Sequence, residues 1–135
     1  MSESDLVHHE ITRAIIGAMY TAHNELGYGF LERVYVGAMS VVLQQQGLHV
    51  SREVPFDILF RGVNIGHYRA DMVVDSKVLV EVKTGNFIDS AHVAQLRNYM
   101  RASGLAVGLL LNFGSSAEFK RLVSTKPSGT PSSAS

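Results

Sequence analysis

Residues 69–83 read RADMVVDSKVLVEVK, and this stretch decides the fold. Two runs rich in β-branched residues flank Asp75-Ser76-Lys77, a triplet of turn-forming residues. The pattern predicts two antiparallel strands joined by a three-residue loop. Counting back from that loop along both strands predicts three facing pairs: Val74 with Val78, Asp71 with Glu81, and Arg69 with Lys83.

The two-residue period of a strand divides these side chains between two faces. One face is apolar and is the predicted core: Met72, Val74, Val78, Val80 and Val82. The other face carries the charges: Arg69, Asp71, Val73, Leu79, Glu81 and Lys83. The hairpin is therefore expected to hold a group of charged side chains over one surface of the sheet.

Asp71 and Glu81 are candidate ligands of a divalent cation. Opposed residues of an antiparallel pair have Cβ atoms about 4.5–5.5 Å apart, and two carboxylates there repel each other unless a cation compensates. Mg²⁺ prefers oxygen ligands, often one or two carboxylates together with water and phosphate. Lys83 is placed to orient an attacking water or to stabilise charge on a phosphate. An ordinary surface ion pair among these three residues would give the same spacing.

The flanking sequence predicts an α/β sandwich around a mixed sheet. The apolar period predicts a helix over 5–26, capped by Ser4, and a second helix after Gly27-Tyr28-Gly29 that ends near Gly47. The core stripe expected for that second helix is Leu31, Val34, Ala38, Val41 and Val42. A strand follows over 54–60, and the hairpin above completes three consecutive antiparallel strands.

Beyond the hairpin, a helix is predicted over 90–102, with Asp89 or Ser90 as N-cap and Gly104 just past its end. Residues 106–112 are apolar on both faces, which is typical of a central strand. Residues 117–123 fit either a last strand or a short helix. We expect one domain over residues 1–123 and a disordered tail over 124–135, which is rich in Ser, Pro and Gly.

Composition narrows the possible functions. The 135 residues include no cysteine, which excludes disulfides and thiolate metal sites and fits a cytoplasmic location. No apolar run is long enough to span a bilayer, so no membrane association is expected. Twelve basic residues balance twelve acidic ones, so contact with nucleic acid would need a local basic patch.

Three motifs in order carry a family resemblance. Residues 29–35, GFLERVY, match the signature of the GxxExxY family, and Asp71 with Glu81-Val82-Lys83 resembles the D…ExK motif of the PD-(D/E)XK superfamily. Residues 95–99, QLRNY, are similar to the QxxxY helix motif of nuclease domains in bacterial recombination enzymes. The resemblance covers about residues 8 to 123 and implies a restriction-endonuclease-like fold with an α-α-β-β-β-α-β core.

The resemblance also implies roles for individual residues. Mg²⁺ or Mn²⁺ would be held by Asp71, Glu81, the carbonyl of Val82 and Glu32, while Lys83 and Gln95 would complete the catalytic set. Substrate contacts are expected from Tyr35, Gln95, Tyr99 and Arg97. Simpler roles also fit the pattern: helix capping for Glu32, packing for Tyr35 and a solvated helix surface for Arg97.

Two functions are therefore open. The first is a divalent-metal-dependent nuclease that hydrolyses DNA, with RNA as the less favoured substrate. The second is a non-catalytic, nuclease-like binding or assembly module, with a homo-oligomer as one form, in which the carboxylates are structural. Zero net charge favours the second, and the ordered motifs favour the first.

Overall fold

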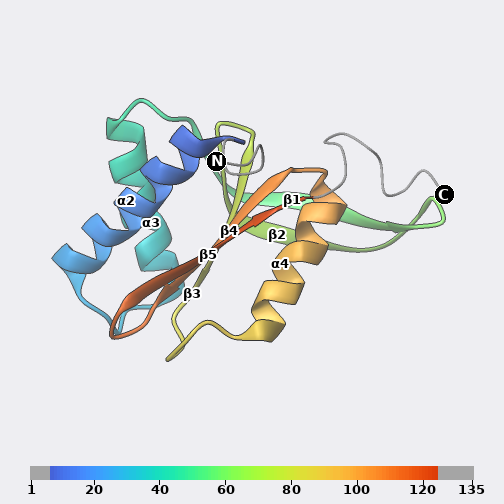
Figure 1. Ribbon diagram of the computed structural model, residues 1–135. Coiled ribbons are helices and arrows are strands. Elements are labelled where there is room, and N and C mark those ends of the chain that lie inside the picture. Colours follow the sequence, from blue (N-terminus) through green and yellow to red (C-terminus); the bar gives the residue numbers. More distant parts are fainter. Residues whose placement is uncertain (1–6, 125–135) are drawn as a thin grey trace.

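The computed structural model describes residues 7–124. It contains three helices and five strands in the described part of the chain (Figure 1): α2 His9–Leu26, α3 Glu32–Gln45, β1 Val50–Phe60, β2 Val63–Val74, β3 Val78–Lys83, α4 Ser90–Ser103, β4 Val107–Phe113 and β5 Ala117–Val123. None of these helices is long and apolar enough to cross a membrane.

The five strands form one mixed sheet in the order β1-β2-β3-β4-β5. Strands β1, β2 and β3 are consecutive and antiparallel, whereas β4 runs parallel to β3 and antiparallel to β5. The parallel step requires a crossover connection, which α4 supplies. The predicted mixed α/β fold is confirmed, and residues 117–123 prove to be a strand.

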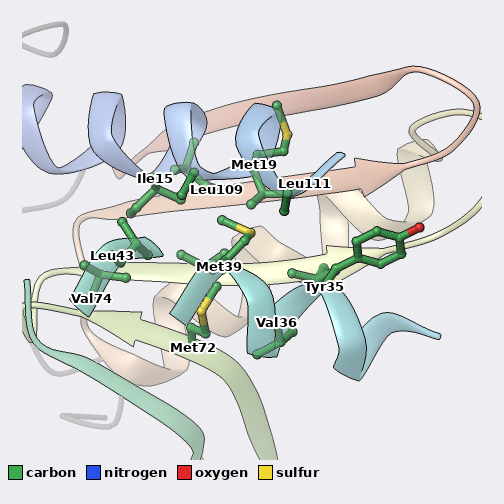
Figure 2. Close-up of a cluster of buried hydrophobic side chains, with 14 of the residues drawn as sticks. Ile15, Met19, Tyr35, Val36, Met39, Leu43, Met72, Val74, Leu109 and Leu111 are labelled. Atoms are coloured by element: carbon green, nitrogen blue, oxygen red, sulfur yellow. The ribbon is translucent and has the colours of Figure 1, made fainter. Parts of the chain in front are cut away.

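One face of the sheet packs against α2 and α3, which lie on the same side of it (Figure 1). Alternate residues of the strands point into this first core, as the two-residue period requires. Figure 2 shows Met39 and Leu43 of α3 beside Ile15 and Met19 of α2 in this core. The predicted core face of the hairpin is confirmed, because its five apolar residues are all 0% exposed: Met72, Val74, Val78, Val80 and Val82.

The opposite face of the sheet is covered by α4. Leu96 and Met100 of this helix pack on a second buried cluster that includes Val73 and Leu79 of the hairpin. The charged face predicted for the hairpin is therefore not an open, solvated surface, because a helix lies over its apolar members. That burial changes the environment of the carboxylates on the same face.

Helix α4 has the boundaries that its sequence predicts. The Asp89 side chain caps the helix by accepting a hydrogen bond from the Ala91 backbone N–H at 2.8 Å. At the other end, Gly104 adopts the left-handed conformation, with φ of 76°, that glycine favours after a helix. Local sequence is sufficient here because both end signals lie within two residues of the helix.

The first helix begins later than predicted, at His9, and the proposed Ser4 cap and the start at Asp5 lie outside the described residues. The core stripe predicted for α3 is only partly correct: Ala38 and Val42 pack partly buried against the core, but Leu31 and Val41 are 64% and 54% exposed. This helix has apolar residues around most of its circumference, so periodicity alone permitted more than one stripe. The side chains that are buried form the neighbouring stripe: Tyr35, Val36, Met39, Ser40 and Leu43.

The predicted tail over 124–135 lies outside the described residues except for Ser124. The backbone N–H of Ser124 donates a hydrogen bond to the Ala106 carbonyl at 2.8 Å. This bond extends the pairing of β5 by one residue beyond the boundary predicted for the ordered chain.

Candidate active site

The candidate site lies where β2 and β3 separate. Val74 pairs with Val78, as the hairpin loop predicts, and regular pairing continues to Met72 and Val80. It stops there, although β3 continues to pair with β4 as far as Lys83. Asp71 and Glu81 occupy the next position along the two diverging strands.

The two carboxylates bridge the strands where the backbone pairing ends. The Asp71 backbone N–H donates to Glu81 Oε2 at 3.1 Å. The Val82 backbone N–H donates to Asp71 Oδ2 at 2.7 Å. Each carboxylate thus satisfies a backbone N–H of the opposite strand that would otherwise lack a partner. The predicted juxtaposition of Asp71 and Glu81 is observed, and the reciprocal bonds fix both side chains.

Burial makes this pair unfavourable when both groups are ionised. Glu81 is only 6% exposed, and burial, reinforced by the neighbouring Asp71 charge, raises the pKa of its carboxyl from 4.5 to about 7. Burial also raises the pKa of Asp71, partly offset by the Val82 hydrogen bond. The charge of Lys83 opposes both increases but is the smaller effect. A cation between the carboxylates would relieve the repulsion.

The side-chain alternation of β2 breaks at Asp71. Tyr68 and Ala70 pack in the α4-side cluster, and so does Val73, which would lie on the opposite face in a regular strand. On β1, Val54 pairs with Ala70 and Arg52 pairs with Met72. Glu53 lies between these two residues of β1, and its φ is +50°, an uncommon value for a residue with a side chain. This irregular backbone on the neighbouring strand accompanies the change of face.

The break corrects the placement of Arg69. Sequence predicted that Arg69 shares a face with Asp71 and faces Lys83, but pairing between β2 and β3 ends before that position. Arg69 pairs instead with Pro55 of β1, is exposed, and lies between two residues that point toward α4. Its side chain therefore points away from the carboxylate pair.

Lys83 ends β3 beside an amide clamp that the sequence analysis missed. Asn112 of β4 pairs with Lys83 in the parallel ladder and is 1% exposed. Its Oδ1 accepts from the Gly85 N–H at 3.0 Å, and its Nδ2 donates to the Gly85 carbonyl at 2.9 Å. The two bonds fix the backbone two residues beyond Lys83. The only sequence signal was one amide side chain at the end of an apolar strand.

Gly114 allows this clamp to form, which gives a first prediction. A Cβ at this position would lie 2.8 Å from the Gly85 carbonyl oxygen, a backbone atom that cannot move aside alone. We expect Gly114→Ala to lower the free energy of unfolding by about 1–3 kcal/mol, measured by urea denaturation. Gly66→Ala is the matched control, since Gly66 has nothing within 4 Å of the added carbon. Equal stability of the two variants would contradict the close approach.

Glu32 and Tyr35 of α3 occupy different environments. Glu32 is exposed at the first position of the helix, and its negative charge adds a small further increase to the pKa of Glu81, after burial and Asp71. Tyr35 is 0% exposed, and its hydroxyl donates to the Gly27 carbonyl at 2.6 Å. Of the two roles considered for Tyr35, the structure supports packing rather than direct substrate contact.

The expected substrate residues on α4 are only partly brought together. Tyr99 is half-buried and close enough to Glu81 for that charge to raise the pKa of its phenol, although burial is the larger cause. Gln95 lies one turn earlier on the same side of the helix and is also half-buried. Arg97 is exposed and about 200° around the helix from Gln95, so it does not join this pair.

An aromatic column that sequence did not predict stands beside Glu81. The rings of Tyr68 and Tyr99 stack at 3.7 Å between centroids, and Phe56 continues the column at 5.4 Å from Tyr68. The Tyr68 hydroxyl donates to the Tyr99 carbonyl at 3.1 Å. Burial and the charge of Glu81 raise the pKa of Tyr68. The column ties α4 to β2.

The donor set at the strand divergence suits a hard divalent ion. Within residues 7–124, the hydrogen bonds of Asp71 and Glu81 involve Oδ2 and Oε2, which leaves one oxygen of each carboxylate for ligation. Two carboxylates completed by water and phosphate are a common arrangement for Mg²⁺. In the described chain, no third His, Asp or Glu joins them, so Glu32 stands apart from the predicted ligand set.

Comparison with known proteins agrees with this fold. Residues 9–122 match the PD-(D/E)XK nuclease superfamily, and because the match spans most of the chain, the protein belongs to that superfamily. The crystal structure of SSO0001 is similar, with a TM-score of 0.53 at 19% sequence identity. The likeness covers 91% of this chain and 62% of that one, and it supports the fold alone. No significant match to a curated protein was found.

Proposed function

We propose that the protein is a divalent-metal-dependent nuclease that hydrolyses phosphodiester bonds of DNA, with RNA as the less favoured substrate. The observation that carries the proposal is the pair formed by half-buried Asp71 and buried Glu81 at the divergence of β2 and β3, with Lys83 two residues after Glu81 on β3. We also propose that the chain belongs to the GxxExxY branch of the superfamily and acts in the cytoplasm.

In this proposal Asp71 and Glu81 hold Mg²⁺ or Mn²⁺, with the Val82 carbonyl as a further ligand. Glu32 would join them only after its exposed side chain moves toward the pair. When bound, the ion supplies a Lewis acid that polarises a phosphoryl oxygen. Membership in the nuclease superfamily and the oxygen-only donor set both support this assignment.

The remaining residues act on substrate and on the attacking water. The Lys83 ammonium is placed to orient that water and to stabilise the negative charge that develops on the phosphate. Gln95 and Tyr99 lie together on α4, where they would position the nucleotide next to the scissile bond. The aromatic column of Phe56, Tyr68 and Tyr99 keeps bulk water from one side of Glu81 and so strengthens the electrostatic interactions there.

The proposal is tested by incubating the purified protein with fluorescently labelled single-stranded and duplex DNA. We expect cleavage with Mg²⁺ or Mn²⁺, none with EDTA, and none from a Glu81→Ala variant purified in parallel. RNA of the same sequence should be cut more slowly. Metal-stimulated cleavage that persists equally in the variant would indicate a contaminating enzyme.

The alternative is a non-catalytic, nuclease-like module that binds nucleic acid or assembles with copies of itself. Metal binding to Asp71 and Glu81 without cleavage of any nucleic acid would favour it. The same outcome would assign the carboxylate pair a structural role.

A further inference from the structure

Two segments beside the site hold large apolar side chains in solvent. The connection from α2 to α3 carries Tyr28 and Leu31, which are 67% and 64% exposed, and Phe30, which is 46% exposed. The connection from β3 to α4 carries Phe87, which is 67% exposed. We refer to Tyr28, Phe30, Leu31 and Phe87 as the apolar rim. Burying a side chain of this kind would stabilise the fold by about 1.5–3 kcal/mol, and the exposed rim lacks that stabilisation. Exposed apolar groups of this kind commonly mark binding sites.

The α2 to α3 segment is held rigidly by Tyr35. The hydroxyl of this buried residue donates to the Gly27 carbonyl at 2.6 Å and accepts from the Phe30 N–H at 3.4 Å. The Tyr35 ring stacks on Phe113 of β4 at 4.2 Å between centroids. The Phe30 ring packs edge-on against Tyr35 at 6.1 Å. This half of the rim is therefore anchored to the end of β4.

The β3 to α4 segment is held at the same end of β4. Asn112, the residue before Phe113, makes the two hydrogen bonds that clamp Gly85. Figure 1 shows the α2 to α3 connection, the turn after β4 and the segment after β3 along one edge of the molecule. Both halves of the rim are thus fixed to adjacent residues of one strand, which makes the rim a preformed surface.

The rim adjoins the carboxylate pair. Leu31 directly precedes Glu32, whose charge is near enough to Glu81 to contribute to its raised pKa after burial and Asp71. Phe87 follows Lys83 by four residues, across the clamped Gly85. A phosphate held by a cation at Asp71 and Glu81 would therefore place the neighbouring nucleotides of its strand at the rim.

We propose that the apolar rim binds unpaired nucleobases by stacking, so that the site takes single-stranded nucleic acid or frayed ends. The zero net charge supports this, because binding through phosphates alone requires several basic contacts that such a chain supplies poorly. Stacking on aromatic side chains does not depend on net charge and needs exposed base faces. Duplex bases cover those faces with their neighbours. The inference rests on the proposed function, since it assumes nucleic acid at the carboxylates.

The absence of tryptophan from the chain allows a direct test. Phe87→Trp introduces one emitter at the rim while keeping a large aromatic side chain. With Mn²⁺ present, and on rapid mixing before cleavage, we expect an oligothymidylate of about 12 nucleotides to quench its fluorescence saturably, whereas a blunt duplex should not. Phe60→Trp is the matched control, because Phe60 is also exposed, at 57%, but lies at the tip of the β1 to β2 hairpin. No quenching, or equal quenching in both variants, would overturn the proposal.

Alanine substitutions in the apolar rim measure how much its side chains contribute to the affinity for oligothymidylate. Phe87→Ala and Tyr28→Ala should weaken oligothymidylate binding by about fivefold to a hundredfold, and Phe60→Ala should leave it unchanged. Rim-dependent binding without metal-stimulated cleavage would refute the nuclease and leave the stacking site in place. Cleavage that depends on Glu81 but is unaffected by either rim substitution would refute the stacking site and leave the nuclease in place.

Discussion

Replacing Lys83 with methionine is expected to lower the rate of DNA cleavage by about 10²-fold or more. Methionine keeps most of the length and apolar stem of lysine but removes the ammonium. Asp71 and Glu81 are held by hydrogen bonds to the opposite strand rather than by Lys83, and within residues 7–124 no ion pair joins Lys83 to either of them. Metal binding should therefore survive the substitution.

Cleavage and metal binding must be measured on the same preparations. Single-turnover cleavage gives the rate, and the increase in melting temperature with Mn²⁺ reports binding to the folded state. Lys120→Met is the control, since Lys120 is an exposed lysine on β5 and outside the site. Wild-type cleavage by the Lys83 variant would remove this residue from the catalytic set and leave it as a surface cation.

The second large effect is expected from Glu81→Gln in the absence of metal. The folded-state pKa of Glu81, about 7, lies above its ordinary value of 4.5, so the folded protein keeps a proton here that the unfolded chain releases. Stability from this group is then fully present below pH 4.5 and declines as the pH rises toward 7. This difference in pKa corresponds to a loss of roughly 3 kcal/mol in the free energy of unfolding when Glu81 ionises. A glutamine at this position stays neutral, so the variant does not suffer that loss.

The variant should therefore be more stable than wild type at pH 8 by up to about 3 kcal/mol, with the difference vanishing near pH 4.5. Urea denaturation in EDTA at several pH values measures this directly. Glu118→Gln, at an exposed position on β5, is the control and should show no such trend. A constant difference at all pH values would show that ionisation of Glu81 does not oppose folding.

Addition of metal should reduce the stability advantage of the variant at pH 8. A cation that binds the folded state stabilises it by RT ln(1 + [L]/Kd), and the variant has lost one of the two carboxylates that would hold that cation. Wild type is then expected to gain more from Mn²⁺ than Glu81→Gln. An equal gain in both proteins would place the ion elsewhere.

Much of the fold follows from local sequence. The loop at Asp75-Ser76-Lys77 and the alternation beside it correctly predict the register of β2 with β3, and the limits of α4 follow from Asp89 and Gly104. These features depend on residues close together in the chain, where periodicity and end signals act directly. The facing of Asp71 and Glu81 was predictable for the same reason.

The predictions that failed concern features that depend on residues distant in the sequence. The buried stripe of α3 was misassigned because its choice depends on what α2 and the sheet present to it, and periodicity offered more than one stripe. Arg69 was misplaced because the alternation of β2 breaks where Glu53 of β1 adopts a left-handed backbone. Neither the buried side of α3 nor the break in β2 can be seen in the apolar period of its own segment.

The sequence by itself determined the mixed α/β fold and the hairpin that brings Asp71 opposite Glu81, because strand alternation and a short loop set that register. Only the tertiary structure decided the environment of the pair. Helix α4 buries the charged face, Asn112 clamps the backbone beyond Lys83, and the Tyr68 and Tyr99 rings stand beside Glu81. Each of these contacts joins segments far apart in the chain, and the raised pKa of Glu81 arises first from its burial in the folded protein.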